Sequence, residues 1–215
     1  MTPVVMVAWP TGATPTVVST SAGGTSSLGL ATVTKPADLA AGNTLLLIFR
    51  NSTAEHYPNE AGWTQLFTAH EPTNQRISAW SKTVASDETA TVEVYSSSST
   101  RAGWNCYQFE GAVEFESAVA LASLDPPELA PAAGSAAYLF LAVLGVAASD
   151  NSFANPAGYS NQLSGGSDAS IADSRSKVVS ARLAVTGTSE NPSAWVASGT
   201  WFYPIAVTVS VRSTA

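Results

Sequence analysis

The sequence predicts an all-β protein, folded as a single antiparallel β-sandwich. Its apolar segments are short, rich in Val, Ile, Thr and aromatic residues, and separated by clusters of Gly, Pro, Ser and Asn, as strands and their turns are. Helical periodicity is almost absent. One pattern of residues in the first half of the chain recurs in the second half. A chain of 215 residues is long enough to bury its own core without disulfides or metal ions.

Each predicted strand follows from the periodicity of its segment. Residues 89–95 alternate, with the apolar side chains on one face and Glu93 and Tyr95 on the other. Residues 45–49 are apolar throughout, which indicates a central strand covered on both faces. One turn of helix is predicted at 118–124, ahead of a Pro-Pro pair. The predicted strands are residues 4–9, 16–20, 28–34, 44–50, 64–68, 77–84, 89–95, 104–110, 136–146, 171–179, 182–186, 194–198 and 201–211.

The repeated pattern has four landmarks in the same order, with the two copies roughly 95 residues apart. A lone copy would leave one apolar sheet face in water, and residues 111–134 are too apolar for a free linker. The two copies, about residues 36–111 and 130–211, are therefore predicted to share one sandwich. That sandwich spans residues 16–215, behind an N-terminal arm of residues 1–15. The paired landmarks are Gly42 and Gly134, Trp63 and Tyr159, Lys82 and Lys177, and Trp104 and Trp201.

Three landmark types have a physical interpretation. Gly42 and Gly134 are predicted at tight turns that need positive φ, which only glycine adopts cheaply. The ring that follows each Pro-containing loop is predicted to close one end of the sandwich. Lys82 and Lys177 are each predicted either to pair with a carboxylate or to lay an aliphatic stem across a sheet edge.

Composition argues against several classes of partner. Nine Lys and Arg against sixteen Asp and Glu give a net charge of −7, so the clustered cations that nucleic acid requires are missing. No apolar run is long enough to span a membrane, and no secretory signal is visible. The single cysteine, Cys106, forms no intramolecular disulfide or Cys-rich zinc site and is predicted to be a buried thiol. We therefore expect no nucleic-acid partner, no membrane and no cofactor.

Candidate catalytic and metal-binding groups lack the spacing that their chemistry requires. Glu110, Glu114 and Glu116 suggest glycosidase-like acid–base work, but their alternation with apolar residues favours the polar face of an edge strand. His56 and His70 match no metal-ligand spacing and are interpreted as solvated loop residues. The acidic segments 150–152 and 168–173 do not fit a known calcium loop and are interpreted as turns. The sequence predicts neither an enzyme nor a metal site.

Aromatic residues are the remaining candidates for binding. Tyr57 and Trp63 lie in predicted loops, from which their rings could stack on a sugar. The apolar run that ends at Trp9 lies outside the repeat and is predicted to add a strand to a partner. Most other aromatic residues are predicted to lie in the core. The predicted partner-contact residues are Val4, Val5, Met6, Val7, Trp9, Tyr57 and Trp63.

The order of these motifs resembles one group of proteins. Pro36 and Gly42-Asn43-Thr44 are followed by Gly62-Trp63-Thr64, Trp80-Ser81-Lys82 and Phe109-Glu110-Gly111, and then by a weaker second copy. Over about residues 30–210 this is similar to the jelly-roll-type β-sandwich virion proteins of tailed bacteriophages. The group usually has Asp where this chain has Asn43. The resemblance implies a jelly-roll-like fold and a place in capsid decoration, head fibres or tail fibres, in a virion assembled in the host cytoplasm.

The sequence therefore favours a non-enzymatic virion structural protein. The leading hypothesis is a capsid decoration or cement protein, which stabilises the phage head by binding the capsid surface. Its partners would be the major capsid protein or other virion proteins, and it would act in many copies or as a homo-oligomer. The alternative is a tail or fibre component that serves as a receptor- or carbohydrate-binding module. A sandwich glycosidase is a third and weaker hypothesis.

Overall fold

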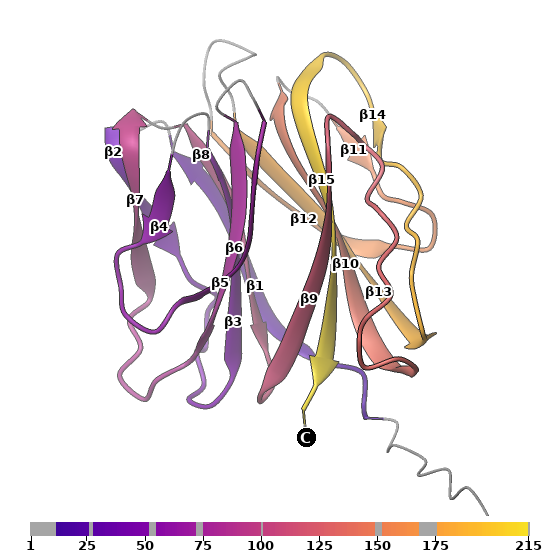
Figure 1. Cartoon of the computed structure of the whole chain (residues 1–215). Coiled ribbons are helices and arrows are strands. Elements are labelled where there is room, and N and C mark those ends of the chain that lie inside the picture. The colour runs from indigo at the N-terminus through magenta and orange to yellow at the C-terminus, as the bar shows by residue number, and fades with distance from the viewer. Residues whose placement is uncertain are drawn as a thin grey trace, which may run out of the picture.

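In the computed structural model, two five-stranded antiparallel sheets face each other (Figure 1). The structure describes residues 12–25, 28–51, 55–71, 75–99, 101–148, 152–167 and 176–214. Sheet A consists, in spatial order, of β1 (Val17–Thr25), β8 (Ala102–Phe109), β3 (Thr44–Asn51), β6 (Arg76–Thr83) and β5 (Thr64–His70). Sheet C consists of β12 (Ser160–Gly166), β13 (Lys177–Gly187), β10 (Ala136–Ala148), β15 (Trp201–Ser213) and β9 (Val113–Leu121). The predicted antiparallel β-sandwich is confirmed.

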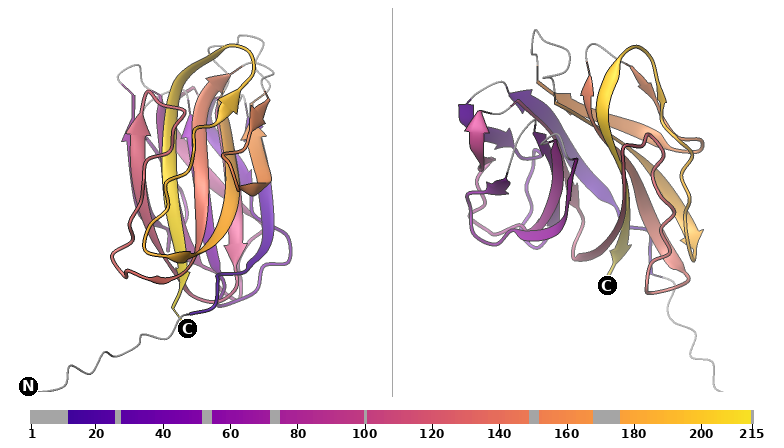
Figure 2. Two further views of the ribbon diagram at one scale, coloured as in Figure 1. Left: turned by 90° about the vertical axis from the view of Figure 1, so that its right-hand side faces the viewer. Right: turned by 45° about the horizontal axis from the view of Figure 1, so that its top comes forward.

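Smaller strands cover the outer face of each large sheet (Figure 2). Outside sheet A lies a three-stranded sheet, called here the outer sheet, of β2 (Leu28–Thr34), β7 (Thr91–Ser99) and β4 (His56–Pro58). Outside sheet C lies the pair β11 (Phe153–Ala154) and β14 (Val196–Ala197), together with the segment that joins β9 to β10. The central strands β3 and β10 are thus covered on both sides, which explains why residues 45–49 are apolar without alternation.

Each large sheet contains four strands of one sequence copy and one strand from just before that copy, β1 or β9, and the two sheets have the same strand order. Sheet A reads β1-β8-β3-β6-β5, and sheet C, from its opposite edge, reads β9-β15-β10-β13-β12. The smaller strands correspond as well. β4 pairs with β7 in the first copy, and β11 pairs with β14 at the equivalent place in the second copy. The repeat in the sequence is therefore a repeat of structure. The jelly-roll likeness within this sandwich stays a prediction.

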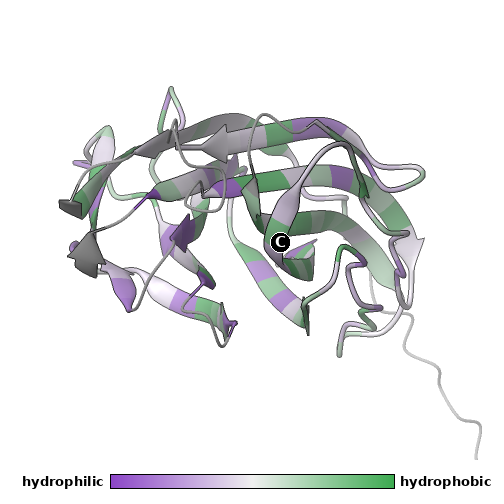
Figure 3. Ribbon diagram, turned by 90° about the horizontal axis from the view of Figure 1, so that it is seen from above, coloured by the Kyte–Doolittle hydropathy of each residue, from purple (hydrophilic) through white to green (hydrophobic). Residues whose placement is uncertain are grey.

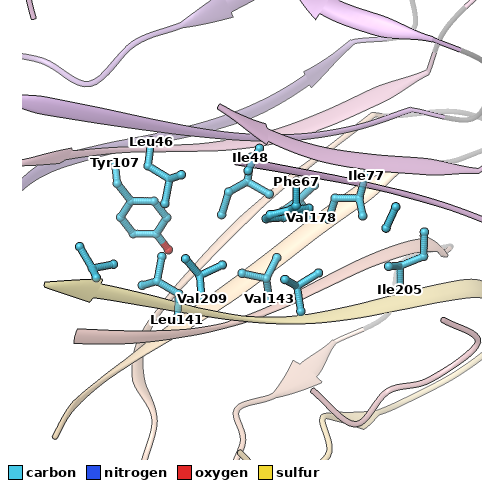
Figure 4. Close-up of a cluster of buried hydrophobic side chains, with 14 of the residues drawn as sticks. Leu46, Ile48, Phe67, Ile77, Tyr107, Leu141, Val143, Val178, Ile205 and Val209 are labelled. Atoms are coloured by element: carbon cyan, nitrogen blue, oxygen red, sulfur yellow. The ribbon is translucent and has the colours of Figure 1, made fainter. Parts of the chain in front are cut away.

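The main core lies between the two large sheets, where side chains of both copies interlock (Figure 4). Leu46, Ile48 and Tyr107 of sheet A face Leu141 and Val209 of sheet C, and all five are fully buried. Seen from above, hydrophobic and hydrophilic residues follow one another along the strands (Figure 3), as half-buried strands require. Among the described residues no helix is long and apolar enough to cross a membrane.

Hydroxyl and amide groups also join the sheets inside this core. The Asn105 side-chain amide donates to the Ser180 hydroxyl at 2.7 Å, and the hydroxyls of Tyr107 and Ser180 lie 2.5 Å apart. Asn105 and Tyr107 belong to β8, whereas Ser180 belongs to β13. Because a buried polar group must be paired, these bonds fix how the two sheets align.

At one corner the sheets approach each other without side chains between them. A Cβ on Gly24 of β1 would lie 1.9 Å from the carbonyl oxygen of Gly166 of β12. A Cβ on Gly165 would lie 2.1 Å from the carbonyl oxygen of Trp104. Only glycine permits such an approach, so this edge of the sandwich is closed by backbone against backbone.

The turns before the central strands follow the prediction. Gly42 and Gly134 have φ of 88° and 71°, and each lies two residues before its strand, β3 or β10. Asn43, which stands where the resembling family has a carboxylate, accepts a hydrogen bond from the Gly111 backbone at 2.9 Å through its side-chain oxygen. An amide oxygen therefore makes at this turn the bond that a carboxylate oxygen could make.

Three expectations about local structure are wrong. Residues 118–124 do not form a helical turn, because 113–121 is the edge strand β9, paired with β15 along its whole length. The predicted strands at 171–179 and 182–186 are not separate in the part of the chain that the structure describes, because 177–187 is one strand, β13; residues 171–175 lie outside the described residues. Strands β4, β11 and β12 occur where turns and loops were expected. Residues 56–58 and 153–154 are too brief to show alternation, and β12 has Leu163 as its one large apolar residue.

Candidate binding surfaces

Three exposed apolar side chains form a row across the outer sheet. Leu30 of β2 pairs with Tyr95 of β7, and Tyr95 pairs with Tyr57 of β4. Their exposed fractions are 38%, 42% and 51%. The ring centroids of Tyr57 and Tyr95 lie 5.2 Å apart, with 36° between the ring planes. These three residues are called the outer-sheet row, and they offer a short aromatic platform to solvent.

Trp63 is not part of this platform. Tyr57 points outward from β4, whereas Trp63 packs against the core cluster between the outer sheet and sheet A. Its indole N–H donates to Glu60 at 3.2 Å. The structure therefore does not bring together the two aromatic residues that the sequence predicts as a sugar-binding pair.

Glu60, whose side chain is 28% exposed, belongs to a largely buried quartet of charges that joins the outer sheet to sheet A. The Lys35 Nζ lies 3.0 Å from Glu60 and also contacts Glu88, while the Lys82 Nζ lies 2.5 Å from Glu60 and 2.9 Å from Glu88. The side chains of Lys35 and Glu88 are 0% and 2% exposed. Two cations and two anions alternate, so the quartet is neutral as a unit. Lys82 thus pairs with carboxylates, one of its two predicted roles.

The protonation of the quartet follows from these contacts. Burial opposes the ionisation of Glu60, but hydrogen bonds from Lys82, Lys35 and Trp63 outweigh it and lower the pKa of Glu60 to about 2. Burial likewise disfavours the charged form of Lys82, but its bonds to Glu60 and Glu88 outweigh it and raise its pKa. All contacts of the quartet are made within the fold, and we interpret it as structural.

A second exposed aromatic surface lies at the start of β15. Trp201, Phe202 and Tyr203 are each 37% exposed, although alternation would turn every second side chain of a strand inward. A β-bulge breaks the alternation, since the pairing of β15 with β10 shifts between Gly145 and Ala147. Bulges commonly re-aim side chains in this way.

The bulge is strained and extends toward β9. Tyr203 has φ of 53°, a left-handed conformation that costs an ordinary residue about 1 kcal/mol or more. Leu121 of β9 pairs with Ile205, two residues after Tyr203, and is 49% exposed. Trp201, Phe202, Tyr203 and Leu121 are called the β15 aromatic surface.

Arg50 holds the bulge from inside the sandwich. Its guanidinium is fully buried and donates to the Ser176 hydroxyl at 3.1 Å and to the Tyr203 carbonyl oxygen at 3.4 Å. Space for it exists because a Cβ on Gly145 would lie 2.8 Å from the Arg50 Cδ. Burial lowers the pKa of Arg50 to about 9, although the Glu71 carboxylate opposes this shift. A costly buried cation thus fixes the strand that carries the aromatic residues.

The three predicted carboxylates are engaged or solvated rather than convergent. Glu114 forms an ion pair with Arg212 on the neighbouring strand β15. Both carboxylate oxygens of Glu116 lie 3.0 Å from the Ala132 backbone N–H, which donates to them. Glu110 is exposed in the turn before β9. Glu114 and Glu116 lie on the edge strand β9, as the edge-strand interpretation expects.

His56 does not lie in a solvated loop, which corrects the prediction. It is 5% exposed on β4, with its ring centroid 5.0 Å from Phe49 and 5.4 Å from Trp80. His70 is exposed at the end of β5. Cys106 is a buried free thiol, and burial raises its pKa to about 12. Across the described parts of the chain, no three His, Cys, Asp or Glu side chains gather as a metal site would require.

Several predicted site residues lie outside the described residues. These are Val4, Val5, Met6, Val7 and Trp9 of the N-terminal arm, Asp150 and Asn151, and the segment 168–173.

Two groups of exposed residues were missed by the sequence-based prediction of the site. Tyr95 was correctly placed on the polar face of its strand, but only the register shows that it lies beside Tyr57 and Leu30. The exposure of Phe202 depends on a bulge that the sequence around it does not predict.

Comparisons of the chain with protein-family models, with curated proteins and with solved structures found no match. Its function must therefore be inferred from its own residues.

Proposed function

We propose that this protein is a non-enzymatic structural component of a bacteriophage particle, bound to the capsid surface as a decoration or cement protein. The observation that carries this proposal is the β15 aromatic surface. Trp and Tyr are the residues that most often dominate the energetics of protein interfaces. Here they stand exposed on a bulge that a buried arginine holds in place.

Preorganisation is what makes this surface suited to binding. A partner that packs on Trp201 and Phe202 does not have to order them, because both residues pair with β10 and Arg50 bonds to the carbonyl oxygen of the neighbouring Tyr203. Leu121, which pairs with Ile205 of the same strand, adds a further exposed apolar side chain. The apolar segment 4–9 supplies further contact in this proposal, by adding a strand to the partner.

The consequence of such binding is a more stable particle. A protein that binds only the assembled shell shifts the equilibrium toward assembly, and many copies multiply the effect. The sequence resemblance to phage virion proteins of the head and tail supports a particle as the site of action. In this proposal many copies of the protein bind the major capsid protein.

Co-sedimentation with purified particles tests the proposal. The recombinant protein is mixed with particles of the phage that encodes it, from which the native copy has been stripped, and occupancy is measured after gradient centrifugation. We expect near-saturating occupancy for the natural sequence, a loss of at least tenfold for the double variant Trp201→Ser/Phe202→Ser, and no binding after deletion of residues 1–15.

Val18→Ser is the matched control, because Val18 is 46% exposed on β1, outside the β15 aromatic surface. It should bind as the natural protein does. Circular dichroism confirms that each variant is folded. Absence of the protein from purified particles, or full occupancy by the Trp201/Phe202 variant, would refute the proposal. A copy number of three or six per particle would indicate a tail protein and not a shell protein.

A further inference from the structure

We propose that the outer-sheet row is a saccharide-binding site, on which a neutral sugar stacks against Tyr57 and Tyr95. This site is separate from the β15 aromatic surface and does not depend on the proposed virion role. It goes beyond the sequence-based hypothesis as well, because that hypothesis paired Tyr57 with Trp63, which packs against the core.

The second copy of the repeat shows that the fold does not need this aromatic pair. In the first copy, buried His56 begins β4, and exposed Tyr57 follows and pairs with Tyr95. In the second copy, buried Phe153 begins β11, and exposed Ala154 follows and pairs with Val196.

The inward position therefore holds a ring in both copies, as packing requires. The outward position holds a pair of tyrosines in the first copy and Ala154 and Val196 in the second. Packing does not account for the tyrosines, since their rings are about half exposed, and an exposed aromatic pair with no structural demand is a candidate for binding.

The chemistry of the face favours a neutral, hydroxyl-rich ligand. The rows beside the tyrosines carry Thr32 opposite Glu93 and Thr34 opposite Thr91, and all four residues are exposed. No Lys or Arg occurs within β2, β4 or the described part of β7. Phenol rings supply flat apolar area for the C–H face of a pyranose, while the phenol and threonine hydroxyls can exchange hydrogen bonds with sugar hydroxyls. The Glu93 carboxylate disfavours anionic glycans.

The size of the row also favours a small ligand over a protein. Three neighbouring strands span about 10 Å, the length of a short oligosaccharide. With roughly 200 Å² for each large side chain, the exposed fractions leave about 250 Å² of the row open. A stable protein interface needs about 800 Å² from each partner. On the side of Thr32 and Thr34 the neighbouring rows are polar, so the apolar area ends there.

Glycan binding is tested with the full chain. The natural protein is run in native gels cast with laminarin, mannan, xylan or dextran, and is applied to a broad glycan array. We expect retardation or array binding with at least one neutral glycan. The variant Tyr57→Ala/Tyr95→Val, which installs the residues of the second copy, should lose at least tenfold in affinity. Alginate, an anionic polysaccharide, should retain the protein less than the neutral ligand does.

Val196→Ala is the matched control, since Val196 is the counterpart of Tyr95 and is exposed. It should bind glycan as the natural protein does. Failure of the folded natural protein to bind any neutral glycan overturns the inference, as does unchanged binding by the Tyr57/Tyr95 variant. If the natural protein is an oligomer and this variant is a monomer, the outer-sheet row is instead an interface between two copies of the chain. If the Tyr57/Tyr95 variant binds phage particles as the natural protein does, the glycan site is independent of the proposed virion role.

Discussion

Removing the most buried anion of the charge quartet, by Glu88→Gln, should strongly destabilise the protein. The Glu88 side chain is 2% exposed and contacts Lys35, whose side chain is 0% exposed, and Lys82. At an effective dielectric constant of about 20, opposite charges roughly 3 Å apart attract by about 5 kcal/mol. Two such attractions are opposed by repulsion from Glu60 and by the cost of burying the carboxylate.

The net effect should be close to 3 kcal/mol. Deleting one member of a buried ion pair typically costs about 3–5 kcal/mol, because the remaining charge is left without compensation. Glutamine keeps the size of the side chain and one acceptor oxygen, so the lower end applies. Urea unfolding at pH 7, followed by circular dichroism and extrapolated to water, measures this loss directly.

A double variant separates charge imbalance from simple loss of contacts. Lys35→Met combined with Glu88→Gln leaves the neutral pair of Lys82 and Glu60, so its cost should be well below the sum of the two single variants. Asp87→Asn, in the same turn and exposed, is the control and should change stability by less than about 0.5 kcal/mol. A loss under about 1 kcal/mol for Glu88→Gln, or additive single effects, would refute the reasoning.

Three further predictions concern the same scaffold. Gly24→Ala should cost about 3 kcal/mol by urea unfolding, because its Cβ would lie 1.9 Å from the carbonyl oxygen of Gly166. Burial of Cys106 should make the natural protein lose stability relative to Cys106→Ala by about 1.4 kcal/mol per pH unit between pH 9 and 12, since the folded thiol keeps its proton to a pKa of about 12; urea unfolding of both proteins across this range measures the difference. The contribution of Glu60 should be complete above about pH 4.5 and lost as pH falls toward its folded pKa of about 2, which acid titration of Glu60→Gln against the natural protein measures.

Each of these predictions has its own control or contrary result. Gly187→Ala is the reference for Gly24, because the nearest atom to its added Cβ is 3.5 Å away, an ordinary contact. Tyr107, whose pKa burial raises to about 12, affects the natural protein and Cys106→Ala alike, so a stability difference between the two that does not change with pH would contradict the Cys106 prediction. Parallel acid curves for the natural protein and Glu60→Gln would show that the quartet does not hold the Glu60 carboxylate ionised.

Local periodicity was enough to predict the all-β class and the doubly covered strand β3. The outward direction of Tyr95 followed from alternation in the same way. The repeat predicted more, because landmarks such as Gly42 and Gly134 occupy equivalent turns in the structure. These features depend on residues close together in the sequence, or on one half of the chain compared with the other.

What the sequence could not reveal depends on contacts between distant residues. The exposure of Phe202 requires a bulge that Arg50 stabilises from the far end of β3, and nothing near Phe202 signals it. The four residues of the charge quartet come from separate turns and strands. The sequence around Lys82 therefore could not show which carboxylate it pairs with. His56 appeared to be a loop residue because β4 is too short for alternation to show that it points inward.

The glycine corner limits how the two sheets can respond to change. β1 and β12 meet there backbone to backbone, without side chains between them. The distance between the sheets at that edge can therefore change only if the strands themselves move. We therefore expect a gain in volume among the interior side chains to be accommodated mainly on the opposite side of the sandwich, where β5 lies beside β9. Leu121 stands at the end of β9, so a swelling of the interior far from the surface would shift one border of the area we assign to partner binding.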